Sequence, residues 1–196
     1  PGSDLTEAPR KPRICMEPYT SCLLEKRHVI LTVTPNASID KTYTVEDFGL
    51  DRINRASDCN TVPGGKGINV VRVLKVMGRA GLATGFVGGR SGEAILQGLT
   101  REGIQHDFVR VAGDSRFCIK IADPKNGTQT EINECGPTVS PDEIGLMMEK
   151  IRSLLPGKEF VVPCGSTPPA TPASLYADII RAAKEAGVRT VLDASG

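Results

Sequence analysis

A glycine-rich loop, Pro63-Gly-Gly-Lys-Gly-Ile-Asn69, leads directly into the apolar segment Val70-Val-Arg-Val-Leu-Lys-Val-Met77. The second part predicts a helix, because its apolar residues recur at helical spacing and Gly78 is typical of a helix end. The recurring apolar residues are Val70, Val73, Leu74 and Met77. Glycines before a helix let backbone N–H groups approach a ligand, and the helix N-terminus favours anions. A tight turn between a strand and a helix needs the same glycines, so both interpretations stay open at this point.

Outward from this loop, apolar runs typical of buried strands alternate with helical patterns as far as the last residues. Strands are predicted at 29–34, 82–87, 108–111, 160–162 and 190–192. Helices are predicted at 70–77, 91–102, 140–155 and 171–186. The third helix opens with the capping box Ser140-Pro141-Asp142-Glu143, and the fourth with Thr171-Pro172. The alternation predicts an α/β fold with a mostly parallel sheet flanked by helices.

Two polar segments interrupt this alternation. Residues 42–62 alternate loosely and are predicted to form exposed strands. Residues 117–132 read as a hairpin, because Pro124-Lys-Asn-Gly127 contains the Asn-Gly turn signal. We expect the two segments to form a small β lid beside the main sheet, where additions of this kind often cover a ligand.

Composition excludes several classes of protein. The 196 residues include 24 Lys and Arg against 23 Asp and Glu, so phosphate-neutralising binding of nucleic acid is not expected. No apolar run is long enough to cross a membrane. The six cysteines form no C-x-x-C pair and none lies near His28 or His106, which argues against a metal site. Scattered cysteines without a secretory signal indicate reduced thiols and a cytoplasmic protein.

Polar groups follow the predicted strands at their C-terminal ends, where open α/β sheets bind ligands. These groups are Asn36 with Asp40, the loop Gly64–Asn69, Gly88-Gly89, Gly165-Ser166 and Asp193. The loop is no Walker A motif, since no Gly-Lys-Ser/Thr occurs. The segment 85–92 only imitates a dinucleotide fingerprint, since its glycine spacing differs from the true pattern.

Single residues of these clusters allow two interpretations each. Asp40 suits hydrogen bonding to sugar hydroxyls, and it equally suits an Asx-turn after a strand. Arg116, Arg55 and Arg90 are candidate phosphate ligands or ordinary solvated charges. Lys66 would either cap a phosphate or face water. Cys164 lacks a histidine partner, so we do not expect it to act as a nucleophile.

Taken together, these motifs resemble the ribokinase-like (PfkB) sugar kinases, in the branch of the 1-phosphofructokinases and tagatose-6-phosphate kinases. The matching motifs occur in family order and spacing across residues 29–196. They are Thr34-Pro-Asn-Ala-Ser-Ile-Asp40, the loop and helix start 63–74, Gly85-Phe-Val-Gly-Gly89, Thr130-Glu-Ile-Asn133, Gly165-Ser-Thr-Pro-Pro169 and Leu192-Asp-Ala-Ser-Gly196. The resemblance implies a ribokinase-like fold with a β lid.

The resemblance also implies roles for individual residues. Asp40 would bind sugar hydroxyls, and Gly64, Gly65, Lys66 and Asn69 would form the sugar site. Arg116 matches the position that holds the phosphate already present on the substrate, with Arg55 assisting and Ser166 nearby. Arginine suits this task because its planar fork bonds two phosphate oxygens at once. The lid in this family often also makes a homodimer contact.

Other family elements are not found in these residues. The family's catalytic base is an aspartate in a Gly-Ala-Gly-Asp motif, expected downstream of Gly196 together with the ATP and Mg²⁺ sites. We therefore expect residues 29–196 to be the N-terminal, sugar-binding part of a kinase whose C-terminal ATP-binding part is missing, with no catalytic or metal-binding residue of its own. Alone, this stretch is expected to be inactive. Residues 1–28, with four prolines and no apolar periodicity, are expected to be a disordered leader or a non-native extension.

The function expected from the resemblance is ATP-dependent phosphorylation of a ketohexose phosphate, foremost fructose 1-phosphate to fructose 1,6-bisphosphate. Tagatose 6-phosphate or fructose 6-phosphate is the alternative substrate. A natural truncation that binds sugar phosphate without catalysis is the alternative from another class of protein.

Overall fold

Six parallel strands form the main sheet of the protein, for which the computed structural model describes residues 29–194. The strands are β1 (Val29–Thr34), β4 (Gly81–Gly88), β5 (Gln105–His106), β6 (Val109–Val111), β9 (Lys158–Pro163) and β10 (Arg189–Thr190). Their order is β10-β9-β1-β4-β5, and β6 pairs with a later part of β4. Every pairing in this sheet is parallel, which confirms the predicted arrangement. The segment 1–28, expected to be a leader, lies outside the described residues.

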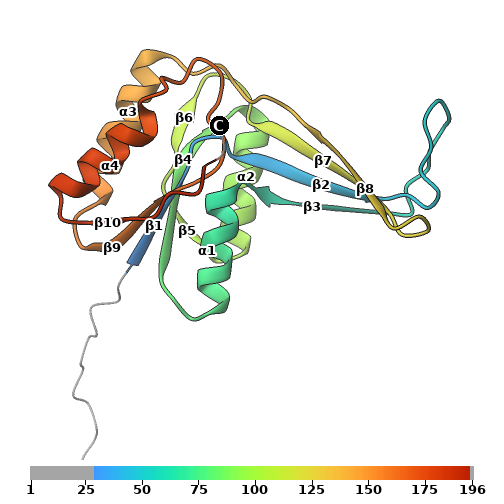
Figure 1. Cartoon of the computed structure of the whole chain (residues 1–196), viewed down its shortest axis with the longest axis horizontal. Coiled ribbons are helices and arrows are strands. Elements are labelled where there is room, and N and C mark those ends of the chain that lie inside the picture. Colours follow the sequence, from blue (N-terminus) through green and yellow to red (C-terminus); the bar gives the residue numbers. More distant parts are fainter. Residues whose placement is uncertain (1–28, 195–196) are drawn as a thin grey trace, which may run out of the picture.

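Two pairs of helices cover the two faces of the main sheet (Figure 1). The helices are α1 (Lys66–Val76), α2 (Gly89–Arg101), α3 (Pro141–Leu154) and α4 (Leu175–Glu185). Strand β4 shows how alternation builds both cores: Phe86 packs with α3 and α4, whereas Ala83 and Val87 pack with α1 and α2. A strand buried on both sides reads as a continuous apolar run, which is why the sequence marks it clearly.

The two segments expected to form a lid build one separate four-stranded sheet, here called the lid sheet. Its strands are β2 (Ser38–Thr44), β3 (Asp58–Gly64), β7 (Arg116–Asp123) and β8 (Thr128–Asn133), in the order β3-β2-β7-β8. β2 and β7 pair in parallel, and the outer pairs are antiparallel. The lid sheet projects sideways from the helices and the main sheet (Figure 1).

Alternation along the strands divides the lid sheet into two faces of different chemistry. The inner face carries polar and charged side chains, among them Asp40 and Arg116. The opposite, outer face carries Ile119 and Ile121 of β7 together with their lateral neighbours Tyr43 and Ile132. Ile132 remains 55% exposed there, and Lys41 lies beside Ile119, so the outer face is largely apolar with one lysine.

Local sequence signals predicted the ends of several helices and strands correctly. The capping box is formed as predicted: the Ser140 side chain accepts a hydrogen bond from the backbone N–H of Glu143, whose side chain accepts one from the backbone of Ser140. The predicted turn at Asn126-Gly127 joins β7 to β8, with Gly127 at a φ of 63° that suits glycine. Both signals are short-range, so no tertiary information was needed to interpret them.

Other element ends were predicted wrongly. The fourth helix begins at Leu175 rather than at Thr171-Pro172, because the Thr171 hydroxyl and N–H both bond back to the carbonyl of Pro168 and close a turn first. The second helix starts at Gly89, two residues before the predicted start at residue 91. β10 ends at Thr190, although the Val191 and Asp193 N–H groups still bond to β9 carbonyls.

The apolar stripe that predicted α1 does not form its buried face. The buried residues of the helix are Gly67, Ile68 and Val71, one turn apart on the side toward the sheet. Val73 is 57% exposed and Met77 is 69% exposed. The helix is apolar on two sides, and only packing against β1 and β4 determines which side is buried. Within residues 29–194, no helix is long and apolar enough to cross a membrane.

Candidate sugar-phosphate site

A cavity of about 410 Å³ lies where the inner face of the lid sheet meets the C-terminal ends of the main strands. Its residues come from segments distant in the sequence: the loop after β1, β2, the start of α1, β7, β8 and the loop after β9. This is the end of an open α/β sheet where ligands are expected. The volume falls within the usual range for small-molecule sites, roughly 300–1,000 Å³.

Asp40 of β2 points into this cavity from the lid sheet. The Ser38 hydroxyl donates a 2.7 Å hydrogen bond to its Oδ1 atom. A Cβ atom at Gly64, on neighbouring β3, would lie only 1.9 Å from the same oxygen, so glycine is required for this carboxylate position. Oδ2 accepts no hydrogen bond from any of the described residues. The carboxylate is therefore oriented by one neighbour and keeps an acceptor for a ligand hydroxyl.

Arg116, the first residue of β7, lies beside Ser38 in the register of the lid sheet. Its Nε donates to the Asn36 carbonyl at 3.3 Å, and its Nη1 donates to the Glu134 carbonyl at 3.1 Å. Both partners are neutral, and no carboxylate of residues 29–194 pairs with this guanidinium. A positioned arginine with spare N–H donors and an unbalanced charge is suited to an anion such as phosphate.

Asn36 follows β1 and connects the two sides of the cavity. Its Nδ2 donates to the Cys135 carbonyl at 2.9 Å and to the Ser166 hydroxyl at 3.3 Å. Its Oδ1 is buried without a hydrogen-bond partner in the described part of the chain. Buried polar atoms are nearly always paired, so an orphan beside a cavity indicates a place for a ligand or water. Sequence analysis noted Asn36 at the strand end but gave it no role.

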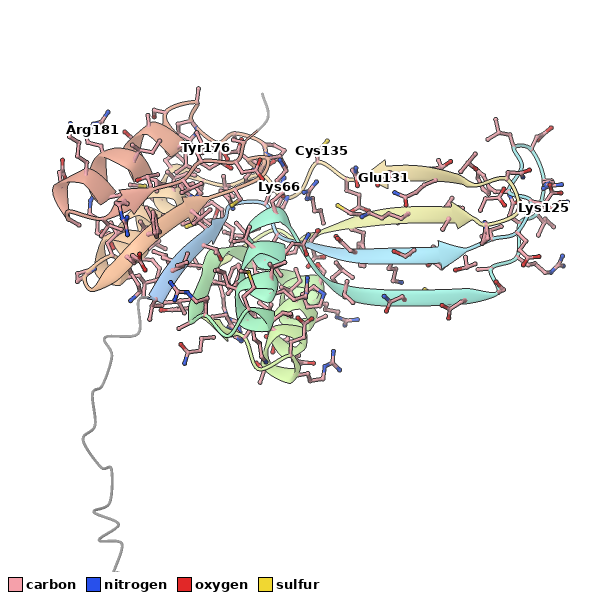
Figure 2. All side chains as sticks on the ribbon, turned by 60° about the horizontal axis from the view of Figure 1, so that its bottom comes forward. Lys66, Lys125, Glu131, Cys135, Tyr176 and Arg181 are labelled. Atoms are coloured by element: carbon pink, nitrogen blue, oxygen red, sulfur yellow. The ribbon has the colours of Figure 1, made fainter. Side chains whose placement is uncertain are left out.

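The glycine-rich loop places the N-terminus of α1 at the edge of the cavity. Gly65, at a φ of 117°, packs against Thr34, where a Cβ would lie 2.5 Å from the Thr34 methyl group. Lys66 forms a 3.0 Å ion pair with Asp193, which follows β10 (Figure 2 labels Lys66). Asn69 accepts a 2.7 Å hydrogen bond from Arg72. Both interpretations of the glycine-rich loop therefore hold: its glycines allow close packing, and the loop also borders the cavity.

Arg55 is not brought to the cavity within one chain. It lies exposed in the loop 45–57, which joins β2 to β3 at the far end of the lid sheet. β2 extends four residues beyond Asp40 towards that end, on the order of 13 Å along the strand, and Arg55 is not part of the cavity wall. Arg90, at the start of α2, is also exposed and is not part of the cavity wall. The other predicted site residues, Gly64 through its contact with Asp40 included, gather at the cavity.

Sequence analysis gave no site role to several residues of the cavity wall, among them Lys120 of β7 and Glu131 and Asn133 of β8, although the last two lie in the matching motif 130–133. They share the inner face with Arg116, because Lys120 is four residues further along the strand and faces Glu131 in the adjacent strand. The period of two starting at Arg116 was the available signal. The pairing of β7 with β8 then brings Glu131 and Asn133 to the same face.

Cys164 is fully buried at the back of the cavity, and its thiol donates to the Val162 carbonyl. Burial raises its pKa to about 11, and the nearby Asp193 carboxylate adds to this effect. A thiol that stays protonated is a poor nucleophile, in line with the expectation for this residue. Burial likewise raises the pKa of Tyr176 to about 12, and its hydroxyl donates a 2.8 Å hydrogen bond to the carbonyl of Gly165.

The described residues 29–194 contain no group of three or more His, Cys, Asp or Glu side chains that could hold a metal ion. No step of the chemistry below is assigned to a metal on the cavity residues. They offer hydrogen-bond acceptors, one guanidinium and two ammonium groups, which suit a polyhydroxylated anion.

Comparison with known proteins agrees with this chemistry. Residues 32–196 match the family model described as pfkB family carbohydrate kinase. The chain is 40% identical over 168 residues to a tagatose-6-phosphate kinase of Staphylococcus epidermidis, covering 86% of this chain and 54% of the relative. The chain therefore spans about half the length of the curated relatives that it matches.

Solved structures give the same result. One described as a possible 1-phosphofructokinase from Thermotoga maritima is similar with a TM-score of 0.82 and 36% identity, over 86% of this chain and 54% of that one. Phosphofructokinase-2 from Escherichia coli, solved with fructose-6-phosphate, is similar with a TM-score of 0.80 and 26% identity, over 85% of this chain and 55% of that one.

Proposed function

The chain belongs to the pfkB family of carbohydrate kinases, and from this premise we propose that the full protein transfers a phosphoryl group from ATP to a ketohexose phosphate. Fructose 1-phosphate is the substrate that we propose first, with fructose 1,6-bisphosphate as the product. The residues described here supply the sugar-phosphate half of the site. The observation that supports this most directly is the single cavity shared by the Asp40 carboxylate and the Arg116 guanidinium.

Four cavity residues have distinct proposed tasks. Asp40, held by Ser38, accepts hydrogen bonds from sugar hydroxyls and orients the sugar ring. Arg116 binds the phosphate already on the substrate, since the carbonyls of Asn36 and Glu134 position its guanidinium without neutralising it. Asn36 and Ser166 add hydrogen-bonding groups at the end of the main sheet. Orientation of this kind, together with electrostatic stabilisation, is the source of most catalysis in phosphoryl transfer.

Family membership also implies a base, an ATP site and Mg²⁺, which we propose to lie outside the residues described here. ATP supplies the phosphoryl group when bound. The described residues bind and orient the acceptor sugar. The N-terminus of α1, at the cavity edge, adds a favourable field for anionic groups of the reactants.

The proposal is tested by assaying the full-length protein with ATP and three acceptors: fructose 1-phosphate, tagatose 6-phosphate and fructose 6-phosphate. We expect the highest kcat/KM with fructose 1-phosphate. Tagatose 6-phosphate is the second candidate, because curated relatives at 40% and 39% identity are tagatose-6-phosphate kinases. Failure to phosphorylate any of the three would overturn the proposed function, and binding without turnover would support a non-catalytic sugar-phosphate-binding protein.

Substitution of the two central residues tests their tasks separately. Arg116→Ala is expected to raise KM for the sugar phosphate by about tenfold or more, since charge-assisted hydrogen bonds contribute roughly 1.5–3 kcal/mol each. KM for ATP should hardly change. Asp40→Asn is expected to lower kcat/KM while circular dichroism shows an intact fold. An unchanged KM for the sugar phosphate in the first variant, or full activity in the second, would remove that residue from the site.

We further propose a homodimer that forms through the outer face of the lid sheet. This face presents Ile132, which is 55% exposed, and Ile119, Ile121 and Tyr43, which are partly exposed in the described structure. Exposed apolar patches of this kind mark interaction surfaces. The Escherichia coli phosphofructokinase-2 has itself been solved in a tetrameric form.

A further inference from the structure

Lys120 occupies a place in the cavity that the tasks above leave unused. It projects from the inner face of the lid sheet, on the same strand and the same face as Arg116. Four residues separate the two, so their Cα atoms are on the order of 13 Å apart. An extended arginine and an extended lysine can reach a phosphate placed between them across such a span.

The only partner of the Lys120 ammonium within residues 29–194 is Glu131, across the β7–β8 pair. Their charged atoms are 4.0 Å apart, at the outer limit of an ion pair. Both side chains are partly open to solvent, with 36% of Lys120 and 41% of Glu131 exposed. An exposed pair at this distance contributes little to stability. Lys120 is therefore a weakly held cation facing a cavity.

The charges of the cavity indicate that binding of a phosphate needs a second cation besides Arg116. Lys66 is already paired with Asp193 at 3.0 Å. Of the remaining charged groups in the wall, Arg116 and Lys120 are positive, and Asp40 and Glu131 are negative. A sugar phosphate brings a charge of about −1.5 to −2 at neutral pH. Arg116 alone cannot balance this charge with two carboxylates in the same cavity.

We propose that the Lys120 ammonium is the second cation, beside Arg116, that binds the phosphate of the substrate. Glu131 pairs with Lys120 only while the phosphate is absent. On binding, the ammonium exchanges a weak pair with Glu131 for a stronger contact with phosphate. The exchange makes the site selective for phosphorylated ketohexoses over the free sugars. Arg116 and Lys120 of the lid sheet then both bind the phosphate, whereas Asp40 binds the sugar hydroxyls.

This inference rests on the proposed function, so its test separates the two. Binding of fructose 1-phosphate and of fructose is measured by calorimetry on the full-length protein without ATP, alongside the kinase assay. Lys120→Met should weaken binding of fructose 1-phosphate by about tenfold or more, as expected for loss of a charge-assisted contact. The weak affinity for free fructose should not change. Lys120→Arg should restore binding to within about threefold, because the charge is retained.

Glu131→Gln should strengthen binding of fructose 1-phosphate by about two- to fivefold, because it removes a competing carboxylate and a like charge. The matched control is Lys125→Met. Lys125 belongs to the same hairpin but lies at the far tip of the lid sheet, paired with Asp47 (Figure 2). It should leave both affinities unchanged.

Two results would overturn the inference: unchanged affinity for fructose 1-phosphate in Lys120→Met, or equal losses for the phosphorylated and the free sugar. Weaker binding in Glu131→Gln would place Glu131 on the sugar and contradict its role as a competitor. If the wild-type protein binds fructose 1-phosphate but transfers no phosphoryl group, the kinase proposal fails and the role of Lys120 is still decided by calorimetry.

Discussion

Gly64 and Asp40 lie closer together than any residue with a side chain at position 64 would permit. The Cβ of an alanine there would lie 1.9 Å from Asp40 Oδ1 and 2.2 Å from its Cγ. The backbone at Gly64 needs no left-handed conformation, so contact alone requires the glycine. This is the clearest case in the molecule of one residue fixing the position of a functional group.

Gly64→Ala should therefore displace the Asp40 carboxylate and raise KM for the sugar phosphate by about tenfold, a loss of roughly 1.4 kcal/mol of binding. Gly145→Ala is the matched control, since Gly145 is in α3 and nothing lies within 4 Å of its added Cβ. That variant should raise the free energy of unfolding by roughly 0.5–1 kcal/mol. Kinetic assays and denaturant unfolding measure the two effects, and equal KM values for both variants would contradict the proposed position of Asp40.

The cysteines differ in reactivity because they differ in burial. Cys164 is buried with a pKa raised to about 11 by burial and by Asp193, whereas Cys59 and Cys135 are exposed. Alkylation at about pH 8 should label Cys59 and Cys135 and leave Cys164 intact, since the thiolate is the reactive form. Peptide mass mapping provides the measurement. Labelling of Cys164 at the rate of Cys59 would show that the back of the cavity is open.

At the scale of elements, the tip of the lid sheet depends on Asp123. This buried carboxylate accepts hydrogen bonds from the backbone N–H groups of Asp47 and Phe48 in the loop 45–57, at 2.9 and 2.8 Å. Asn126 also donates to it from its side chain, at 2.8 Å. Burial alone would raise the pKa of Asp123, but these hydrogen bonds outweigh burial and lower it to about 2.

A lowered pKa in the folded state means that the carboxylate stabilises the fold above its unfolded pKa of about 3.9. That contribution is lost as the pH falls from about 4 towards 2. Hydrogen exchange of the loop 45–57, corrected for intrinsic rates, should accelerate over this range. In Asp123→Asn the loop should exchange faster at neutral pH and show a smaller acid-dependent step, whose remainder comes from Asp47, because its pairing with Lys125 lowers its pKa as well. Asp51→Asn, an exposed position in the same loop, should behave like the wild type, and an acid step of wild-type size in Asp123→Asn would exclude this explanation.

At the scale of the whole molecule, the lid sheet has one face for the substrate and another that remains apolar. Ile132, 55% exposed on the outer face, should lie within the proposed homodimer contact. Ile132→Asp is therefore expected to shift the full-length protein from dimer to monomer in sedimentation velocity, since a buried unpaired charge is strongly unfavourable. Leu146→Asp, on the outer side of α3 and 52% exposed, should leave the assembly unchanged. A monomeric wild type, or a dimer that both variants retain, would contradict a contact through this face.

The sequence by itself determined the helices and most strands of the main sheet, although not β5, together with the lid hairpin and the cavity residues that directly follow the buried strands. Those features depend on local periodicity, on a capping box and on polar residues directly after buried strands, all of which are short-range signals. The family motifs added the tasks of Asp40 and Arg116, because their order and spacing are linear properties of the chain.

Only the tertiary structure decided which face of α1 is buried, that Arg55 lies away from the cavity, and that Lys120 and Glu131 belong to it. These properties depend on strand pairing between distant segments, such as β2 with β7, where Ser38 meets Arg116. A one-residue change of register would turn every one of these side chains to the other face. Local patterns describe the face of a strand, and long-range pairing determines which neighbour that face meets.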